Sequence, residues 1–386
     1  MESDERYMWL ALDLARQGWG KTNPNPAVGA VLVKDGEVVG TGFHEAAGKE
    51  HAEITALQNA GDKAQGATLY INLEPCCHYG RTPPCVDALI SAGIRRAVVG
   101  NIDPNPLVSG KSLKKLEAAG ISVKTGVLEE KAQRLNEAFF KYIASGKPFV
   151  ALKMAMTLDG KIATRGGKSQ WISGERSRNF VHHLRSMSDG VMVGINTVLQ
   201  DDPQLTVRLE EETKRHPVRI IVDSRGRIPM ESKVVLSAKE TKTILATTDL
   251  APPEKLEKLS SAGVEVLLLP LKNNRVDLGS LISALGKKEI CVLLVEGGGT
   301  LNYALLEEGL LDKLYIFIAP LLFGGKDALT PVEGEGIDSV ENAWAVHDIE
   351  LKQLENDLLI IGYPMRGEEI VYGDNRRAWR NNTKAI

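Results

Sequence analysis

The first part of the chain alternates between short apolar runs and segments with apolar residues at helical spacing. Residues 7–17 have the helical pattern, and apolar runs at 27–33 and 37–42 flank Asp35-Gly36, a pair typical of a β-hairpin turn. Beyond them, the pattern predicts helices that begin near His51 and Cys85, strands at 67–73 and 96–100, and a final helix and strand at 114–119 and 121–124. This alternation predicts a sheet covered by helices, an α/β layer sandwich.

A second set of elements begins after Ser145-Gly146-Lys147-Pro148, a short stretch that is typical of a linker. The strands predicted beyond it are 149–154, 190–193, 218–222, 243–246, 264–269 and 290–295, with helical patterns between several of them. This half is therefore also predicted to be an open α/β sheet. We predict one domain over residues 1–145, a second over 147–364, and a polar tail over 365–386 that is disordered.

Composition is that of an ordinary globular protein. The chain has 386 residues, of which 43% are hydrophobic and 25% charged, and this length suggests two or three domains of roughly 150 residues. A net charge of −3 gives no electrostatic basis for binding nucleic acid. The acidic N-terminus lacks the apolar core of a signal peptide, and no run of about 18 apolar residues occurs. We expect a cytoplasmic protein whose partners include neither a membrane nor a nucleic acid.

A histidine and cysteine pattern in the first half carries the strongest chemical signal. His51-Ala52-Glu53 is followed by Glu74-Pro75-Cys76, and Cys85 comes nine positions after Cys76. One imidazole and two thiolates can hold Zn²⁺ with a fourth position open, as catalytic zinc sites do. Glu53 is not needed as a ligand, so it can move protons for a zinc-bound water. This order of residues is the signature of the zinc-dependent nucleobase deaminases.

Further features favour zinc over a chance grouping. Three of the four cysteines lie in one cluster, which fits metal binding in a reducing compartment better than a disulfide framework. Pro83-Pro84 predicts a helix that begins at Cys85, and a helix N-terminus lowers the pKa of a thiol. Residues 77–84 would then form a loop beside the metal. The alternatives are a structural zinc site and ordinary buried cysteines.

The second half contains two glycine-rich motifs, and both are incomplete. Gly166-Gly167-Lys168-Ser169 lacks the earlier glycine of a phosphate-binding P-loop, because Ile162 stands there. Residues 297–302 follow a predicted strand but end in Asn302, so they are not a full dinucleotide-binding fingerprint. Their glycines still lie at a strand-to-helix junction, where backbone N–H groups can bind a cofactor pyrophosphate. A tight structural turn is the alternative.

With both halves laid out, the chain from about residue 5 to 364 resembles the bifunctional riboflavin-biosynthesis enzymes. These join a pyrimidine deaminase to a 5-amino-6-(5-phosphoribosylamino)uracil reductase. Besides the zinc cluster, the matching segments are Asn23-Pro24-Asn25-Pro26-Ala27-Val28-Gly29, Gly42-Phe43-His44, Asp103-Pro104-Asn105-Pro106, Leu152-Lys153, Leu158-Asp159-Gly160-Lys161, Ser169-Gln170-Trp171-Ile172, residues 201–208 and Val295-Glu296-Gly297-Gly298. The chain departs from the family pattern at Gly110-Lys111-Ser112, where Gly-Arg-Gly or Gly-Lys-Gly is expected.

The resemblance implies an N-terminal cytidine-deaminase-like three-layer α/β/α domain with zinc held by His51, Cys76 and Cys85. The implied substrate is a free nucleotide with an amino group at pyrimidine C2 and a ribose 5-phosphate. The residues that match substrate contacts of the family are Asn23, His44, His78, Arg81, Asp103 and Asn105. Amide and carboxylate groups suit the ring edges, and Arg81 suits the phosphate. Asn23 and Asp103 flank prolines, so turn formation is their alternative role.

For the second half, the resemblance implies a dihydrofolate-reductase-like α/β domain that binds NADPH and reduces the sugar to a ribityl chain. The implied cofactor contacts are Ala155, Trp171, Thr197, Asp201, Ser224 and the segment from Gly298 onward. The implied substrate contacts are Ser169, Arg185, Leu205, Arg208 and Glu296, with Arg185 and Arg208 apt for the phosphate. Lys153 and Glu296 are predicted at the ends of apolar strands, where sites form in open α/β sheets. We expect Lys153 to orient or stabilise the opening sugar, with a structural ion pair as the alternative.

Two other functions are compatible with the zinc motif. The first is an enzyme that has retained only one of the two activities. The second is a tRNA-type deaminase, which would not need 200 or so further residues of reductase pattern and would carry a basic surface. His182, His183, His216 and His347 belong to no motif, and we interpret them as surface or packing residues. We expect a homo-oligomer that acts on a small-molecule nucleotide.

Overall fold

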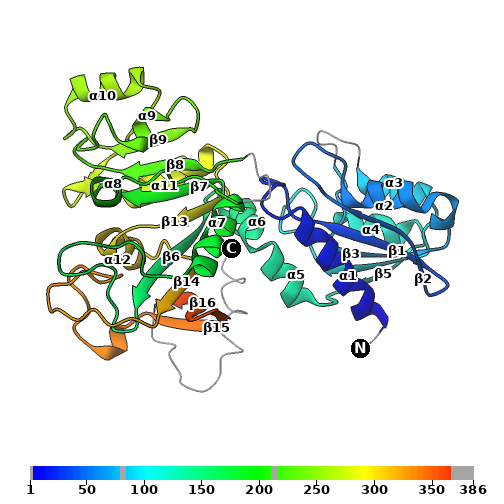
Figure 1. Ribbon diagram of the computed structural model, residues 1–386. Helices are drawn as coiled ribbons and strands as arrows, with labels where there is room; N and C mark the ends of the chain where they lie inside the picture. Colours follow the sequence, from blue (N-terminus) through cyan, green and yellow to red (C-terminus); the bar gives the residue numbers. More distant parts are fainter. Residues whose placement is uncertain (1–2, 79–83, 210–214, 367–386) are drawn as a thin grey trace. The chain divides into compact units, whose positions relative to one another are not determined.

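The computed structural model describes residues 3–78, 84–209 and 215–366 (Figure 1). The chain divides into two compact units, residues 1–147 and 148–386, which we call the N-terminal unit and the C-terminal unit. The division falls between Lys147 and Pro148, within the Ser-Gly-Lys-Pro stretch. Residues 367–386, most of the predicted tail, lie outside the described residues.

The described part of the N-terminal unit contains one five-stranded sheet, in the order β2-β1-β3-β4-β5. Its strands are β1 (Gly29–Lys34), β2 (Glu37–Phe43), β3 (Thr68–Leu73), β4 (Arg96–Asn101) and β5 (Ser122–Thr125). Its helices are α1 (Ser3–Gln17), α2 (Ala52–Ala60), the 3-10 helix η1 (Gly61–Ala64), α3 (Cys85–Ser91), α4 (Lys111–Ala118), α5 (Glu129–Leu135) and α6 (Glu137–Ser145). β1 is antiparallel to β2 and β3, while β3, β4 and β5 are parallel. The predicted hairpin around Asp35-Gly36 is confirmed, since Lys34 pairs with Glu37.

Helices cover both faces of this sheet. Side chains alternate between the two faces of a strand, so Ala30 and Leu32 of β1 pack with α2, α3 and α4. Val31 and Val33 point the other way and pack with α1 and α5. The predicted three-layer α/β/α arrangement is therefore confirmed. Because α2 and α3 cover the same face, the residues at their N-termini can meet at one edge of the layer.

The described part of the C-terminal unit contains a nine-stranded sheet, in the order β10-β9-β8-β7-β13-β6-β14-β16-β15, and a two-stranded β11-β12 ribbon. Its strands are β6 (Phe149–Thr157), β7 (Gly190–Gly194), β8 (Val218–Val222), β9 (Thr243–Thr247), β10 (Glu265–Leu268), β11 (Leu271–Lys272), β12 (Arg275–Val276), β13 (Val292–Val295), β14 (Lys313–Ala319), β15 (Ala345–Leu354) and β16 (Asp357–Met365). Its helices are α7 (Glu175–Ser186), α8 (Ile195–Asp201), α9 (Lys233–Leu236), α10 (Pro253–Ser261), α11 (Leu278–Lys287), α12 (Gly299–Glu307) and the 3-10 helix η2 (Val340–Asn342). The strands from β10 to β14 are parallel, and β16 is antiparallel to both β14 and β15.

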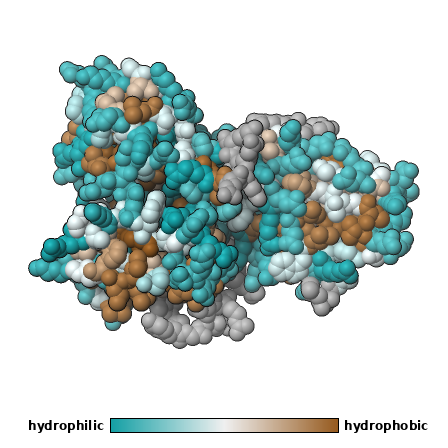
Figure 2. All heavy atoms as spheres, viewed as in Figure 1, coloured by the Kyte–Doolittle hydropathy of each residue, from teal (hydrophilic) through white to brown (hydrophobic). Residues whose placement is uncertain are grey.

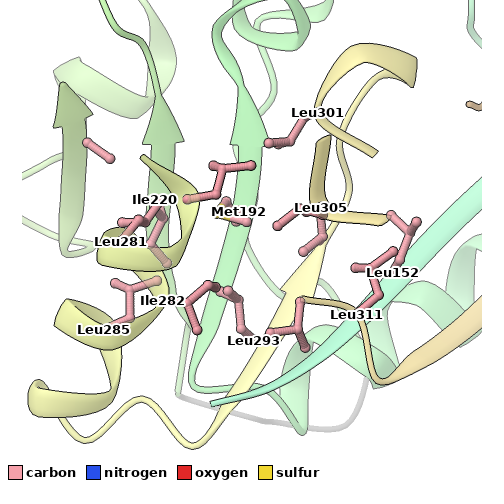
Figure 3. Close-up of a cluster of buried hydrophobic side chains, with 14 of the residues drawn as sticks. Leu152, Met192, Ile220, Leu281, Ile282, Leu285, Leu293, Leu301, Leu305 and Leu311 are labelled. Carbon is pink, nitrogen blue, oxygen red and sulfur yellow. The ribbon is translucent and has the colours of Figure 1, made fainter. Parts of the chain in front are cut away.

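Apolar side chains fill the space between this sheet and its helices. Figure 3 shows one cluster, in which strand residues meet residues of α11 and α12: Leu152, Met192, Ile220 and Leu293 from the strands, and Leu281, Ile282, Leu285, Leu301 and Leu305 from the helices. A separate cluster joins β7, β8 and β9 to α8, α9 and α10. The helices therefore cover both faces of a mainly parallel sheet, as predicted for an open α/β fold.

The sequence pattern did not predict the last three strands of this sheet, β14, β15 and β16. β15 has exposed residues along much of its length, and its register with β16 shifts between His347 and Glu350, so it lacks a clean alternation. β16 extends to Met365, whose partner is Ala345 of β15. The predicted tail therefore begins too early, because its first residue belongs to the sheet.

No helix in the described ranges is both long and apolar enough to cross a bilayer. The face drawn in Figure 2 is largely hydrophilic, with hydrophobic residues in separate groups.

Candidate active sites

His51, Cys76 and Cys85 meet in the N-terminal unit, and their ligand atoms all lie within 4.8 Å of one another. The Nδ1 atom of His51 is 3.2 Å from the Sγ atom of Cys85 and 3.6 Å from that of Cys76. One imidazole nitrogen and two sulfurs at these distances suit Zn²⁺, and three protein ligands leave a fourth position for water or substrate. The donor set therefore fits a catalytic zinc ion.

Element ends bring these three residues together. His51 is the N-cap of α2, Cys85 is the first residue of α3, and Cys76 lies in the turn that follows β3. The backbone N–H of Cys85 donates to Cys76 Sγ over 3.3 Å, so the start of α3 supports a thiolate at Cys76. Donation from the Cys85 thiol lowers the pKa of Cys76, and the pKa of Cys85 is raised in return. The predicted helix start at Cys85 is confirmed, but the backbone N–H there stabilises the thiolate of Cys76 and not that of Cys85.

Glu53 lies in the first turn of α2 and is almost completely buried. Burial, followed by the nearby Cys76 sulfur, raises the pKa of its carboxyl to about 7. The Glu53 carboxyl also interacts with the Cys85 thiol. A carboxyl with a pKa near neutrality beside a metal-binding cluster is suited to accept a proton and to donate it again.

His44 lies next to this cluster, with its ring centroid 5.3 Å from that of His51. Its Nδ1 faces the backbone carbonyl of Glu50 at 2.9 Å, and its Nε2 lies 3.2 Å from the amide nitrogen of Asn25. An amide N–H can only donate, so His44 is neutral with the proton on Nδ1. Burial lowers the pKa of His44, in agreement with this form. The sequence reasoning missed Asn25, although it stands in the same Asn-Pro-Asn-Pro segment as Asn23, which is half-buried.

Asp103 and Asn105 lie on the segment after β4. Asp103 is buried, and its charge interacts with Cys76 and with the exposed His78, while burial raises its pKa to about 6. Asp103 Oδ1 accepts a hydrogen bond from the backbone N–H of Asn105 at 2.8 Å. The structure therefore brings His44 and Asp103 to the metal cluster. Arg81 lies outside the described residues.

In the C-terminal unit, Lys153, Arg185 and Glu296 form a charged cluster. Arg185 donates to both carboxylate oxygens of Glu296, from Nε at 2.5 Å and from a terminal nitrogen at 2.9 Å. Leu152 of β6 pairs with Val295 of β13, so the next residues, Lys153 and Glu296, are level on neighbouring strands. Glu296 follows β13 directly, as predicted. The prediction for Lys153 is wrong in one respect, because β6 continues to Thr157 and Lys153 lies within the strand.

Residues 202–208 form a loop after α8, and several side chains hold this loop in place. Arg185 donates to the carbonyl of Thr206 at 3.1 Å, and His182 Nδ1 accepts from the backbone N–H of Arg208 at 3.2 Å. Leu205 is buried, with a left-handed φ of 55°, whereas Arg208 is exposed and donates to Gln204. His182 is therefore more than a packing residue. Its position three residues before Arg185 on α7 places both on one helix face, and this spacing is the signal that the sequence reasoning missed.

The other residues predicted to bind cofactor or substrate in this unit differ in their exposure and in their hydrogen-bond partners. Ser169 donates to Asp201, over 2.7 Å, which joins a predicted substrate contact to a predicted cofactor contact. Trp171 is 66% exposed, and the guanidinium of Arg178 lies 4.9 Å from its ring centroid. Thr197 and Ala155 are half-buried on α8 and β6. Ser224 follows β8 and accepts from the backbone N–H of Val276 at 3.0 Å.

Gly298 is the N-cap of α12. Among Gly297, Gly298 and Gly299, it is the one at which a side chain would meet no neighbouring atom. A Cβ atom on Gly297 would lie 2.8 Å from Asn302 Oδ1, and one on Gly299 would lie 2.5 Å from the carbonyl oxygen of Thr330. Nothing lies within 4 Å of a Cβ position on Gly298. No side chain within the described ranges caps this helix start. Gly297 and Gly299 are thus explained by packing, while Gly298 leaves room for a ligand near free N–H groups, which fits a cofactor phosphate.

A hollow in the C-terminal unit contains none of the predicted site residues. Its walls include Tyr303 of α12, Glu333 and Trp344. The clusters around His51 and Glu296 have the metal-binding and charged groups that chemistry needs, so they are the candidate active sites.

Two family models match the chain, one on each unit. The model "Cytidine and deoxycytidylate deaminase zinc-binding region" matches residues 1–101, and "RibD C-terminal domain" matches residues 148–360. The first match contains His51, Cys76 and Cys85, so the N-terminal unit carries a zinc-binding deaminase region.

Relatives match nearly the whole chain. Riboflavin biosynthesis protein RibD of Aquifex aeolicus is 48% identical over 93% of this chain and 98% of its own length. The Escherichia coli protein of the same name is 45% identical over 92% of this chain and 98% of its own.

Solved structures agree in fold. Acinetobacter baumannii RibD has a TM-score of 0.85 at 38% identity and covers 95% of this chain and 99% of that one. The Thermotoga maritima diaminohydroxyphosphoribosylaminopyrimidine deaminase/5-amino-6-(5-phosphoribosylamino)uracil reductase has a TM-score of 0.81 at 37% identity, covering 94% and 99%. The predicted fold classes, deaminase-like and dihydrofolate-reductase-like, are confirmed by these matches. The chain belongs to the riboflavin biosynthesis protein RibD family, and it is a bifunctional enzyme that combines a deaminase with a reductase.

Proposed function

We propose that this enzyme deaminates 2,5-diamino-6-(5-phosphoribosylamino)pyrimidin-4(3H)-one in its N-terminal unit and reduces the product with NADPH in its C-terminal unit. The product of reduction carries a ribityl phosphate chain. The name of the Thermotoga maritima enzyme, which is 37% identical, supports both substrates. The proposal assigns residues 1–145 to the deaminase domain and 147–364 to the reductase domain.

Glu53 is the proton carrier of the deamination. Zinc, when bound by His51, Cys76 and Cys85, lowers the pKa of a coordinated water toward neutrality. The buried Glu53 carboxylate would accept one proton from the attacking water and deliver it to the ring nitrogen. It would then move a second proton, from the hydroxyl that the attack leaves on the ring carbon, to the amino group that departs as ammonia. Its raised pKa supports this role, since a carboxyl that titrates near pH 7 can act in both directions.

The proposal also assigns polar residues of the N-terminal unit to the substrate. We assign the ring edges to Asn23, His44, Asp103 and Asn105, and the ribose phosphate side to His78 and Arg81. The position of His44 beside the predicted ligand His51, with ring centroids 5.3 Å apart, supports its place in this assignment. Asp103 is held by its own chain segment, so its free oxygen can accept from an amino group.

In the reductase, NADPH supplies the hydride that reduces C1′ of the ring-opened sugar. Gly298 would admit its pyrophosphate at the start of α12, and Ala155, Trp171, Thr197, Asp201 and Ser224 would complete the cofactor site. Ser169, Arg185, Leu205, Arg208 and Glu296 would bind the substrate. Lys153 has a pKa lowered by burial, although Glu296 opposes the shift, so its amine is suited to orient the opening sugar and to exchange a proton with it.

We also propose a cytoplasmic location and a homo-oligomeric assembly. The thiols of Cys76 and Cys85 must stay reduced to bind metal, which supports a cytoplasmic location. We propose a homo-oligomer, and β15 supports this because it is an edge strand with exposed Ile349 and Leu351. Light scattering on the purified enzyme would test the assembly.

The single observation that carries the proposal is the metal cluster with Glu53 beside it. The test is an assay with the diaminopyrimidine nucleotide, with and without NADPH. We expect ammonia release without NADPH, and NADPH oxidation that starts only after deamination has supplied its substrate. Ammonia release without any NADPH oxidation would leave a single activity, and the absence of both would reject the substrate.

A further inference from the structure

Glu74 links the metal-binding turn to the segment that carries Asp103. It is 3% exposed, stands directly after β3, and precedes Pro75-Cys76. Its backbone N–H donates to the carbonyl of Asn101 at 2.8 Å, at the end of β4. A glutamate this deeply buried needs hydrogen-bond partners, because an unpaired carboxylate would cost several kcal/mol.

Three donors from one segment of chain satisfy the Glu74 carboxylate. Oε2 accepts from the backbone N–H of Asp103 at 3.2 Å and from that of Gly110 at 2.9 Å, and Oε1 accepts from the Ser112 hydroxyl at 2.5 Å. Ser112 is completely buried in the first turn of α4. Gly110 is the N-cap of α4 and has a left-handed φ of 71°, so it brings no capping side chain of its own. Glu74 therefore caps α4 from a distant part of the sequence.

We propose that Glu74 is a positioning residue of the deaminase, which fixes residues 103–112 against the Cys76 turn so that Asp103 faces the metal cluster. One residue, Pro75, separates Glu74 from the predicted zinc ligand Cys76, and one hydrogen bond links it to the predicted substrate contact Asp103. Asp103 in turn holds Asn105 through the backbone N–H of that residue, at 2.8 Å. The inference rests on the proposed role of Asp103 in binding the pyrimidine.

Ser112 contributes a side chain where the family pattern led us to expect glycine. Its hydroxyl adds a third hydrogen bond to the two that backbone N–H groups provide. Ser112→Gly and Ser112→Ala remove this bond alone. They therefore test the link without leaving a buried carboxylate unpaired, because both backbone donors remain.

Glu74→Ala and Glu74→Gln form the decisive pair. Glu74→Ala leaves the N–H groups of Asp103 and Gly110 without an acceptor, whereas Gln can accept both at its carbonyl and donate its amide to Ser112. We expect Glu74→Ala to lower kcat/KM for deamination by about 10- to 100-fold, mainly through KM, because a displaced binding group has effects of this size. Glu74→Gln should restore most of this loss, and the Ser112 variants should lose less than Glu74→Ala.

Rates are measured per bound zinc on the full chain, with reduction of deaminated nucleotide as the internal control. Asp4→Ala is the matched stability control, since Asp4 is a buried carboxylate with partners Arg96, Lys124 and Tyr70 on the α1 side of the sheet. It should lower the melting temperature without changing KM. A double-mutant cycle with Asp103→Asn should be non-additive if Glu74 acts through Asp103.

Several results would overturn the inference. A Glu74→Ala enzyme with normal kcat/KM per zinc would reduce Glu74 to a stability role, as would additive effects in the cycle. Equal losses in Glu74→Gln and Glu74→Ala would point to the charge of Glu74 and not to its position. If Glu74→Ala fails to fold, the two Ser112 variants serve as the test. An unchanged KM for deamination in both would reject the proposed link between Glu74 and residues 103–112. A wild-type enzyme that does not deaminate the nucleotide would instead reject the proposed function.

Discussion

Arg185 and Glu296 form a two-point ion pair, with nitrogen–oxygen distances of 2.5 and 2.9 Å. The resemblance implies that both residues contact the substrate. The carboxylate of Glu296 neutralises the charge of Arg185, and Arg185 also donates to the carbonyl of Thr206, so it helps to hold the 202–208 loop. Of the two arginines proposed for the substrate phosphate, Arg208 is exposed, and among the described residues its side chain donates to a neutral group, Gln204. This favours Arg208 over Arg185 for the proposed phosphate contact.

Substitution of Glu296 should lower both the stability and the activity of the reductase, and Glu296→Ala should lower them more than Glu296→Gln. Both side chains are nearly buried, at 12% and 10% exposure, so Glu296→Ala leaves a buried guanidinium without its carboxylate. We expect the free energy of unfolding of the C-terminal unit to fall by about 3 kcal/mol or more. Glu296→Gln retains one acceptor and should lose less. Chemical denaturation and NADPH oxidation measure the two effects, and unchanged deamination is the control. Equal stability of Glu296→Ala and wild type would show that the pair contributes nothing.

The zinc assignment predicts opposite results for two neighbouring cysteines. Cys85 is buried beside His51, whereas Cys77 is half-buried and its thiol faces the carbonyl of Leu107 at 3.7 Å. Cys85→Ser should lose zinc because a hydroxyl is a poor substitute for a thiolate ligand. Cys77→Ser should keep one zinc per chain. Metal analysis of both variants tests this prediction. Retained zinc in Cys85→Ser would reject Cys85 as a zinc ligand.

Glu53→Gln keeps the shape of the side chain and removes its capacity to carry a proton. Zinc should remain bound, since Glu53 is not one of the three ligands. Deamination should fall by at least about 100-fold, the lower end expected for general acid–base catalysis. Reduction of nucleotide that has already been deaminated should continue at the wild-type rate. Near-normal ammonia release from the variant would contradict the role of Glu53.

The sequence predicted the metal cluster well because His51 and Cys85 stand at element starts, which spacing and prolines mark. It did not predict the residues that hold the substrate segments. Glu74 and His182 act on backbone N–H groups far along the chain, 29 residues away for Asp103 and 26 for Arg208, and no local pattern records such contacts. β15 was missed because exposure on an edge strand removes the alternation by which strands are recognised. The sequence pattern therefore predicted the metal cluster, but it did not predict Glu74 and His182, whose side chains hold neighbouring chain segments in place.

A pH-dependent stability is predicted from Asp4. Hydrogen bonds from Arg96 dominate the lowering of its pKa, and Lys124 and Tyr70 add to it. A carboxyl with a lowered folded-state pKa stabilises the fold above its unfolded pKa of about 4, and this stability is lost as pH falls through the folded value. Asp4→Asn should therefore cost about 2 kcal/mol near pH 7, the size expected of hydrogen bonds to a charged group. Denaturation at several pH values should show the difference between variant and wild type shrinking below about pH 4. A difference that is constant with pH would contradict the ionic origin.

The division at Lys147-Pro148 predicts that each unit folds alone, because each has its own sheet and its own apolar clusters. A fragment of residues 1–147 should bind zinc and release ammonia without any nicotinamide. A fragment from 148 onward should bind NADPH and reduce only the deaminated nucleotide. Within it, Lys153→Ala should lower turnover more than cofactor affinity, since the amine faces Glu296 and is expected to act on the sugar. Fluorescence titration with NADPH measures the affinity, and a folded fragment that fails to bind NADPH would reject the reductase assignment.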